Sequence, residues 1–489
     1  MTLGSTALKD LFAHDAGRVE NFSWEAAGIW FDWSKTHIDA AQVAAGVARL
    51  HQADFVEWRR RLAEGEVVNE TEGRAAEHTA ERGTGAEDSV AIARALHARM
   101  RGLVEAIHQG LLGEISHIIH VGIGGSKLGP DLLVDALGRE HARYELHVVS
   151  NVDGMALKEA FGRCDPHRTL LVIASKTFTT SETMLNASSV IEWMEEAGVE
   201  DCYGRIVALT ADPDKALEWG VDETRILPFS DTVGGRYSLW SSIGFPAALV
   251  LGWDAFADLL AGAAAMDRHF MEADPARNAP VIAALIDRIY VEQFGCQTRA
   301  VFAYDERLRE LPGYLQQLEM ESNGKSVDHA GKRLAMPSAP ITWGGVGTDG
   351  QHAVFQLLHQ GTVIAPMEFL AVIEPGHDLD EAHHLQLLTN CLAQASALMT
   401  GRYSDDPARS YPGDRPSVTI LLDRIDPVTL GALIAFYEHR TFVNAVLIGN
   451  NPFDQFGVEL GKQMAREIAE SGAGHMDPST ANLAKRIGI

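Results

Sequence analysis

The feature that most constrains the fold is a repeated alternation of short β-rich runs with helical stretches. The runs "HIIHVGIGG", "ELHVVSNVDG", "TLLVIASKTF" and "RIVALTADP" lead into Gly, Ser, Asn, Thr or Asp, and helical stretches separate them. This alternation predicts βαβ units and a parallel sheet. A second series follows a helical segment around residues 254–295, with strand candidates "RAVFAYD", "PMEFLAVIE", "PSVTILLD" and "FVNAVLIGN". We therefore expect an α/β protein with two mainly parallel sheets.

Helices are expected before and after the two α/β series. Residues 20–115 read mainly as helix, since "AAQVAAGVARLHQADFVEWRRRLAEG" has apolar residues at three- and four-residue spacing and ends in glycine. The C-terminal run "GVELGKQMAREIAESG" is typical of an amphipathic helix. A chain of 489 residues is suited to two or three domains.

Composition narrows the class of protein. Hydrophobic residues make up 46 % of the chain, enough for a large core, and the formal net charge is −26. Such a surface should repel nucleic acid and anionic membranes. The four cysteines are far apart with no C-x-x-C pair, which favours free thiols in a reducing cytoplasm. The sequence also shows no signal peptide and no apolar run long enough to span a bilayer, so we expect a cytoplasmic protein.

The run "VGIGGSKLGPDLL" resembles a phosphate-binding turn between a strand and a helix. It fails the dinucleotide fingerprint, because Gly122 and Gly124 fit but Lys127 occupies the third glycine position. It also fails the P-loop pattern, since Pro130 follows Gly129 where lysine is needed. A helix N-terminus after glycines still suits a small anion. A tight turn without a ligand explains this stretch about equally well.

A second turn, "SKTFTTSET", makes a phosphorylated ligand the better interpretation. It places Ser175, Lys176 and several threonine hydroxyls between a strand and a helix, a combination that suits a phosphate monoester. The alternative is helix capping, because Thr179 and Glu182 have the spacing of a capping box. Capping accounts for neither Lys176 nor the surplus hydroxyls.

Six motifs in order give the chain a strong resemblance to the glucose-6-phosphate isomerase family. They are "VGIGGSKLGP", "SKTFTTSET", "GGRYSLWSSIG", "MESNGK", "GTDGQHAVFQLLHQGT" and "DQFGVELGK", and the similarity begins near "NFSWEAAGIWFDWSK". The resemblance implies two sugar-isomerase (SIS) domains, a homodimer with a shared active site, and no metal or nucleotide cofactor. The domain limits we expect are a helical N-terminal segment packing on the second SIS domain (1–95), the first SIS domain (96–253), linker helices with the second SIS domain (254–450), and a C-terminal helical segment (451–489).

The resemblance also assigns roles to residues. Glu321 is similar to the family's base, and Arg236 to the residue that supports the enediolate. His352 and Lys462 match the ring-opening groups, and Glu182 matches a carboxylate that orients the histidine. The substrate contacts implied are Gly125, Ser126, Ser175, Lys176, Thr177, Thr180, Gln317 and Gln455. Aldose–ketose isomerisation does require a carboxylate base and stabilisation of an enediolate.

Two positions depart from the family pattern, and some alternatives stay open. Asp349 and Asp414 stand where the family usually has asparagine, and a carboxylate near His352 could change the pH dependence. The run "GHDLDEAHH" offers possible metal ligands but lacks a metal-site spacing, so we expect a polar helix start. The expected reaction is the interconversion of D-glucose 6-phosphate and D-fructose 6-phosphate. An isomerase that also accepts mannose 6-phosphate and a catalytically silent sugar-phosphate sensor are the alternatives.

Overall fold

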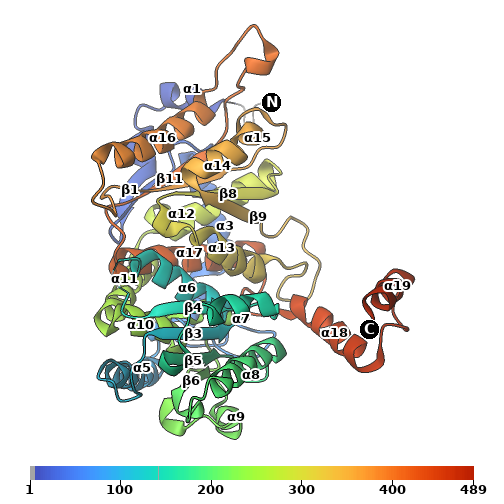
Figure 1. The fold of residues 1–489 in the computed structure, drawn as a ribbon. Coiled ribbons are helices and arrows are strands. Elements are labelled where there is room, and N and C mark those ends of the chain that lie inside the picture. The colour runs from blue at the N-terminus through green and yellow to red at the C-terminus, as the bar shows by residue number, and fades with distance from the viewer. Residues whose placement is uncertain (1–5, 141) are drawn as a thin grey trace. The chain divides into compact units, whose positions relative to one another are not determined.

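Two sheets carry the fold, which is shown in Figure 1 as a computed structural model that describes residues 6–140 and 142–489. The first sheet is entirely parallel and has the strand order β4–β3–β5–β6–β7. Its strands are β3 (His117–Gly122), β4 (Glu145–Val149), β5 (Thr169–Ala174), β6 (Ile206–Thr210) and β7 (Ile226–Pro228). The expected α/β class is thereby confirmed, with helices on both faces of the sheet.

The second sheet is mixed and has the order β1–β2–β11–β10–β8–β9. Four of its strands are parallel, namely β8 (Thr298–Tyr304), β9 (Ile341–Val346), β10 (Met367–Val372) and β11 (Ser417–Leu422). The hairpin β1 (Ser23–Ala26) and β2 (Ile29–Asp32) adds two antiparallel strands to the β11 edge. The prediction of mainly helix over residues 20–115 is wrong at this hairpin. Strands of four residues are too short for their alternation to stand out beside a longer helical pattern.

The strands predicted from continuous apolar runs, such as β5 and β10, are present in the structure. Every residue of β5 and of β10 is buried, as expected for parallel strands covered on both faces by helices. The stretch "FVNAVLIGN", predicted as a strand, lies instead mainly in the helix α17 (Pro427–Ile448). Since α17 is buried on nearly all sides, its sequence has no polar face to reveal a helical period.

Helices cover both sheets and fill the space between them. In Figure 1, α11, α12 and α17 lie between the two sheets. The helices that accompany the first sheet are α5 (Glu87–His108), α6 (Gly125–Leu137), α7 (Gly154–Phe161), α8 (Ser181–Glu196), α9 (Pro213–Glu218) and α10 (Phe245–Leu251). The remaining helices up to residue 448 are α1 (Leu8–His14), α2 (Arg18–Phe22), α3 (Ala40–Gln52), α4 (Phe55–Ala63), α11 (Trp253–Glu272), α12 (Ala279–Arg288), α13 (Leu311–Leu315), α14 (Gly347–Ala353), α15 (Phe355–Gln360) and α16 (Glu381–Thr400).

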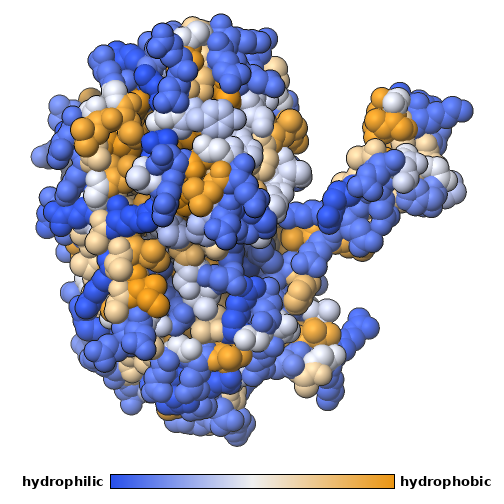
Figure 2. Space-filling model, turned by 90° about the horizontal axis from the view of Figure 1, so that it is seen from below, coloured by the Kyte–Doolittle hydropathy of each residue, from blue (hydrophilic) through white to orange (hydrophobic). Residues whose placement is uncertain are grey.

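Met1–Pro452 forms one compact unit and Phe453–Ile489 a second. The second unit contains α18 (Glu459–Ser471), which confirms the predicted amphipathic helix, and α19 (Pro478–Ile487). No residue of α18 is buried, and Figure 2 shows hydrophobic and hydrophilic residues side by side on this segment. The finer domain limits at residues 95 and 253 stay a prediction. Within residues 6–140 and 142–489, no helix is long and apolar enough to cross a membrane.

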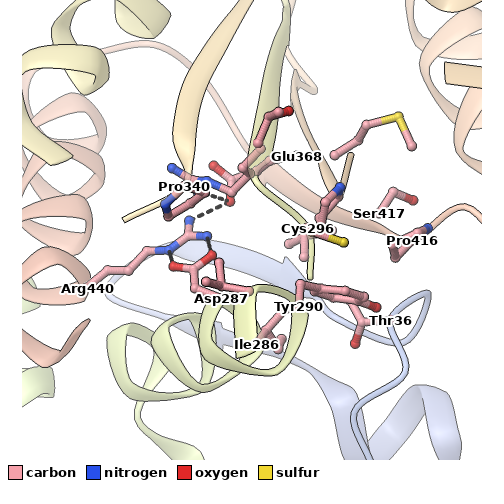
Figure 3. Close-up of a pocket in the computed structure, with 16 residues that line it drawn as sticks. Thr36, Ile286, Asp287, Tyr290, Cys296, Pro340, Glu368, Pro416, Ser417 and Arg440 are labelled. Atoms are coloured by element: carbon pink, nitrogen blue, oxygen red, sulfur yellow. Dashed lines mark hydrogen bonds and ion pairs between the residues drawn. The ribbon is translucent and has the colours of Figure 1, made fainter. Parts of the chain in front are cut away.

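A buried ion network joins α17 to the second sheet (Figure 3). The guanidinium of Arg440 donates to both oxygens of Asp287, at 2.8 and 2.7 Å, and to Glu368 of β10 at 2.6 Å. Burial would raise the pKa of Asp287, but the positive charges of Arg440 and Arg299 outweigh it and lower the pKa to about 2. Each buried carboxylate in this network thus stays ionised because a guanidinium lies beside it.

Replacing Arg440 should therefore leave two buried carboxylates without their main partner. We expect Arg440→Met to lower the free energy of unfolding by about 3–5 kcal/mol, visible as a lower midpoint in urea. The matched control is Arg409→Met, since Arg409 pairs with Asp406 on the surface and its side chain is 81 % exposed. The control should change stability by less than about 0.5 kcal/mol. Equal effects of the two variants would contradict a stabilising role for the buried network.

Candidate active site

The glycine turn lies at the carboxyl end of β3, the strand edge where α/β proteins bind ligands. Its backbone approaches other segments too closely for side chains. A Cβ atom on Gly124 would lie 2.9 Å from Nε2 of Gln317, and one on Gly125 would lie 2.1 Å from the carbonyl oxygen of Gly235. Gly124 also has φ +59°, which favours glycine. The turn therefore brings the start of α6 against Gln317 and the residue before Arg236.

Ser126 lies in the first turn of α6. Its hydroxyl has no hydrogen-bond partner in the described part of the chain, so it is available to a ligand. Its main-chain carbonyl accepts a 2.7 Å hydrogen bond from Nε2 of His120, which is buried in β3. Burial lowers the pKa of His120 to about 4, so this imidazole is neutral at pH 7 and supports the turn without adding charge.

The second turn, between β5 and α8, lies beside the first. Strands β3 and β5 are neighbours, and Gly122 pairs in register with Ala174. The turn is rich in hydroxyls: Ser175 Oγ lies 3.1 Å from Thr180 Oγ1, and Thr177 Oγ1 lies 2.8 Å from Thr179 Oγ1. The two turns therefore follow neighbouring strands at the same edge of the sheet.

The capping-box interpretation of this turn is wrong. The N-cap residue of α8 is Thr180, one residue later than the capping box requires, and its side chain makes no capping hydrogen bond. Glu182 instead accepts a 2.9 Å hydrogen bond from the Ser181 hydroxyl. The Thr180 side chain thus leaves the start of α8 uncapped, and a helix N-terminus of this kind suits an anion.

Lys176 is held at the edge of this turn. Its ammonium donates to the main-chain carbonyls of Asp231 (2.6 Å) and Val233 (3.2 Å), and it lies 3.1 Å from Asp231 Oδ1. Burial lowers the pKa of Lys176, and the Asp231 carboxylate opposes this shift only in part. The positive charge of Lys176 is thus partly neutralised within the protein.

Glu321 and Gln317 lie together on a π-helical turn, Gln316–Glu321, that continues α13. Gln317 Nε2 donates to Glu321 Oε2 at 2.9 Å, and Arg236 Nη1 lies 3.7 Å from the same oxygen. No contact to Oε1 is found among the described residues, and the Glu321 side chain is 20 % exposed. The carboxylate is therefore fixed through one oxygen and offers the other for proton transfer. π-Helical turns occur frequently at functional sites.

The rest of "MESNGK" holds this turn in place. Lys325 Nζ donates to the carbonyls of Glu321 (2.9 Å) and Ser322 (2.8 Å) at the end of the turn. Asn323 Nδ2 donates to the carbonyl of Thr441 in α17 at 2.9 Å. A Cβ on Gly324 would lie 2.3 Å from the carbonyl oxygen of Met320. The motif "MESNGK" thus contains both the carboxylate and the residues that hold its backbone in place.

The remaining predicted site residues lie on α14 and in the second unit. His352, at the end of α14, is exposed and has no polar partner among residues 6–140 and 142–489, so no hydrogen bond joins it to Glu182. Asp349 lies in the first turn of the same helix and is exposed. In the second unit, Lys462 is exposed on α18 and Gln455 precedes that helix.

Asp414 has a structural role. It is buried with φ +58°, a backbone conformation that asparagine and aspartate tolerate better than most residues. One of its oxygens accepts a 2.8 Å hydrogen bond from the backbone N–H of Leu8 and lies 3.1 Å from Nε2 of His37.

Two cavities lie away from these residues. The cavity in Figure 3 is at the amino ends of β8, β10 and β11, and its volume of about 20 Å³ suits one water molecule. A cavity of about 970 Å³ lies at the carboxyl ends of the same strands, where Arg139 and Arg307 already pair with Asp135 and Asp305. Neither contains a residue of the six motifs.

Two imidazoles of the histidine-rich run "GHDLDEAHH" make local contacts to the main chain. His377 Nδ1 accepts a hydrogen bond from the backbone N–H of Leu379, and His384 Nε2 lies 2.8 Å from the carbonyl oxygen of Ile373. Asp380 caps α16, as a polar helix start predicts. Among the described residues, no group of three or more His, Cys, Asp or Glu side chains is placed to hold a metal ion.

The chain is similar over nearly its whole length to proteins of one family. A family model described as phosphoglucose isomerase matches residues 32–484. The glucose-6-phosphate isomerase of Rhizorhabdus wittichii is 65 % identical over 482 residues, which span 99 % of this chain and 96 % of that protein. That of Zymomonas mobilis is 60 % identical over 477 residues, 97 % of this chain and 94 % of that protein.

Structural similarity is equally extensive. The crystal structure of a glucose-6-phosphate isomerase from Chlamydia trachomatis superimposes with a TM-score of 0.90 at 29 % sequence identity, covering 99 % of this chain and 96 % of that one. The match thus includes both sheets and the turns that follow their strands. On the extent of these similarities, the chain belongs to the phosphoglucose isomerase family.

Proposed function

We propose that this protein catalyses the reversible isomerisation of D-glucose 6-phosphate to D-fructose 6-phosphate. The observation that carries the proposal is the Glu321 carboxylate, held through one oxygen by Gln317 and Arg236 and open at the other. Full-length relatives that bear the name of this enzyme support the substrate. A silent sugar-phosphate sensor would not require such a carboxylate.

The chemistry follows from these positions. Glu321 Oε1 removes the proton from C2 of the open-chain aldose and returns it to C1, while the hydroxyl proton passes from O2 to O1, so the carbonyl moves from C1 to C2. The guanidinium of Arg236 stabilises the negative charge of the enediolate between these two transfers. We assign opening of the sugar ring to His352 and Lys462, and orientation of the histidine to Glu182. Gln455 is assigned to the sugar end.

The phosphate is assigned to the two adjacent strand-end turns. Hydroxyls of Ser126, Ser175, Thr177 and Thr180 and the uncapped start of α8 are donors of the type that a phosphate monoester accepts. Gly125, whose backbone lies close to Gly235, is assigned to the same site. Lys176 adds a charge near the turn, although Asp231 offsets part of it.

We further infer a cytoplasmic homodimer in which each active site receives His352 from the partner subunit. The exposure of His352, without a polar partner in the described chain, supports this arrangement. Four buried free cysteines support a reducing compartment.

The direct test is a two-step assay of fructose 6-phosphate conversion. Isomerisation is run with excess chelator and without nucleotide, and the glucose 6-phosphate formed is then measured with a dehydrogenase. We expect full turnover, since none of the assigned groups needs a metal or nucleotide. Activity that appears only after adding zinc or manganese would refute the metal-free mechanism, and no conversion under any condition would refute the proposed function.

Glu321→Gln keeps the shape of the side chain and removes the base. We expect turnover to fall by about 10²–10⁴-fold while the sugar phosphate still binds. Exchange of the C2 proton with solvent, followed by NMR in D₂O, should fall in parallel. Glu310→Gln, which alters a partly exposed carboxylate just before α13, is the control and should behave like the wild type. Persisting exchange in Glu321→Gln would assign the base to another residue.

Lys176→Ala should mainly weaken substrate binding. A contact to the phosphate is present in both the ground state and the transition state, so we expect KM to rise about tenfold with kcat little changed. Lys127→Ala is the matched control, because Lys127 lies in the glycine turn but pairs with Asp131 at 3.1 Å. A large fall in kcat at constant KM would contradict a phosphate-binding role for Lys176.

Hybrid dimers test the shared site. Glu321→Gln and His352→Ala homodimers should each be nearly inactive. If the two are unfolded together in equal amounts and refolded, about half of the dimers should be hybrids, and one of the two sites in each hybrid carries no lesion. We therefore expect recovery of about a quarter of the wild-type activity. Verified hybrids that remain inactive would show that each site is built from one subunit.

A further inference from the structure

The guanidinium of Arg236 is held by two residues to which no role has yet been given. Arg236 Nε donates to Ser322 Oγ at 2.7 Å, and its central carbon lies 5.5 Å from the centroid of the Tyr237 ring. The Tyr237 hydroxyl in turn lies 2.9 Å from Ser322 Oγ. All three side chains are buried, so these contacts do not compete with water.

The Tyr237 ring also packs against a buried histidine. Its ring centroid lies 4.7 Å from that of His78, which is also buried. Burial raises the pKa of Tyr237 to about 12, so the phenol stays neutral and keeps its hydroxyl proton for hydrogen bonding. Burial also holds the pKa of His78 well below its usual value, so the imidazole adds no positive charge beside the guanidinium. The pair thus forms a rigid, uncharged support.

Ser322 links Arg236 to the segment that carries Glu321. Ser322 directly follows Glu321, so its bond to Arg236 ties the segment that carries the base to the segment that carries the guanidinium. Arg236 Nη1 lies 3.7 Å from Glu321 Oε2, a separation that a small rotation of the guanidinium would change. Misplacing a reacting group by about 1 Å can cost about 100-fold in rate. Ser322 and Tyr237 therefore control the geometry of both groups at once.

We propose that Ser322 and Tyr237 are positioning residues that hold the Arg236 guanidinium beside the Glu321 carboxylate and the reacting carbons of the substrate. The proposal deepens the proposed function and rests on it for its kinetic consequences. The structural part of the proposal is that the Ser322 hydroxyl holds the guanidinium in place, and this part does not depend on which substrate is bound.

The kinetic test is a double-mutant cycle. In Ser322→Ala we expect kcat to fall about 10- to 100-fold with KM within about threefold, and in Tyr237→Phe a smaller fall of the same kind. In an Arg236→Ala background, Ser322→Ala should cause no further fall, because the group it positions is absent. Ser242→Ala is the control, since Ser242 is equally buried nearby but donates to the carbonyl of Pro228. It should keep kcat within about twofold of the wild type.

Equal losses from Ser322→Ala with and without Arg236 would overturn the proposal, and so would a rise in KM at constant kcat. Crystal structures of Ser322→Ala and Tyr237→Phe provide a readout that does not depend on the reaction. A displaced or disordered guanidinium is expected in Ser322→Ala, and an unmoved one in both variants would overturn the proposal. If the wild-type protein fails to isomerise fructose 6-phosphate, the proposed function fails, while these structures still decide the positioning role.

Discussion

The guanidinium of Arg236 has to satisfy its hydrogen bonds inside the protein, because the side chain is only 1 % exposed. It does so with groups from separate segments, namely the Ser322 hydroxyl and the carbonyl oxygen of Pro452, and it approaches the Glu321 carboxylate. A buried charge without these partners would be costly. The requirement to pair one cation therefore fixes the relative positions of the π-helical turn, the "GGRYSLW" turn and the end of the first structural unit.

Close backbone approach adds a second constraint. The glycine turn contacts Gln317 on one side and Gly235 on the other, and it does so only because Gly124 and Gly125 lack side chains. Gln317 in turn donates to Glu321. The turn that we assign to the substrate and the carboxylate that we assign to proton transfer are thus linked through one side chain. Gly124 and Gly125 therefore mark a close backbone contact even though the turn matches no nucleotide-binding motif.

The sequence predicted what depends on local pattern. Continuous apolar runs such as β5 and β10 and the polar residues just after β3 and β5 were identified correctly, because burial on both faces and strand-end turns leave local signatures. The α17 segment was misassigned, since a helix buried on nearly all sides has no periodic signal. The partners of Arg236 could not be predicted, because Ser322 and Pro452 meet it only through tertiary packing. Ser322 and Tyr237 lie inside the recognised motifs "MESNGK" and "GGRYSLWSSIG", and this was the one available clue to them.

The charge balance of the site bears on how an anion could bind to a protein with a net charge of −26. Lys176 offers less than a full positive charge to a ligand, because Asp231 lies 3.1 Å from its ammonium. Arg236 Nη1 lies 3.7 Å from the Glu321 carboxylate, and we assign its guanidinium to the sugar end of the site. Binding of a phosphate should then depend largely on neutral donors, the hydroxyls of Ser126 and Ser175 and the N–H groups that begin α8. Dipolar donors of this kind act at contact distance, and screening by salt within roughly 10 Å at about 0.1 M removes most of the long-range repulsion. We therefore infer that this acidic protein binds an anionic substrate through oriented dipoles more than through opposite charge.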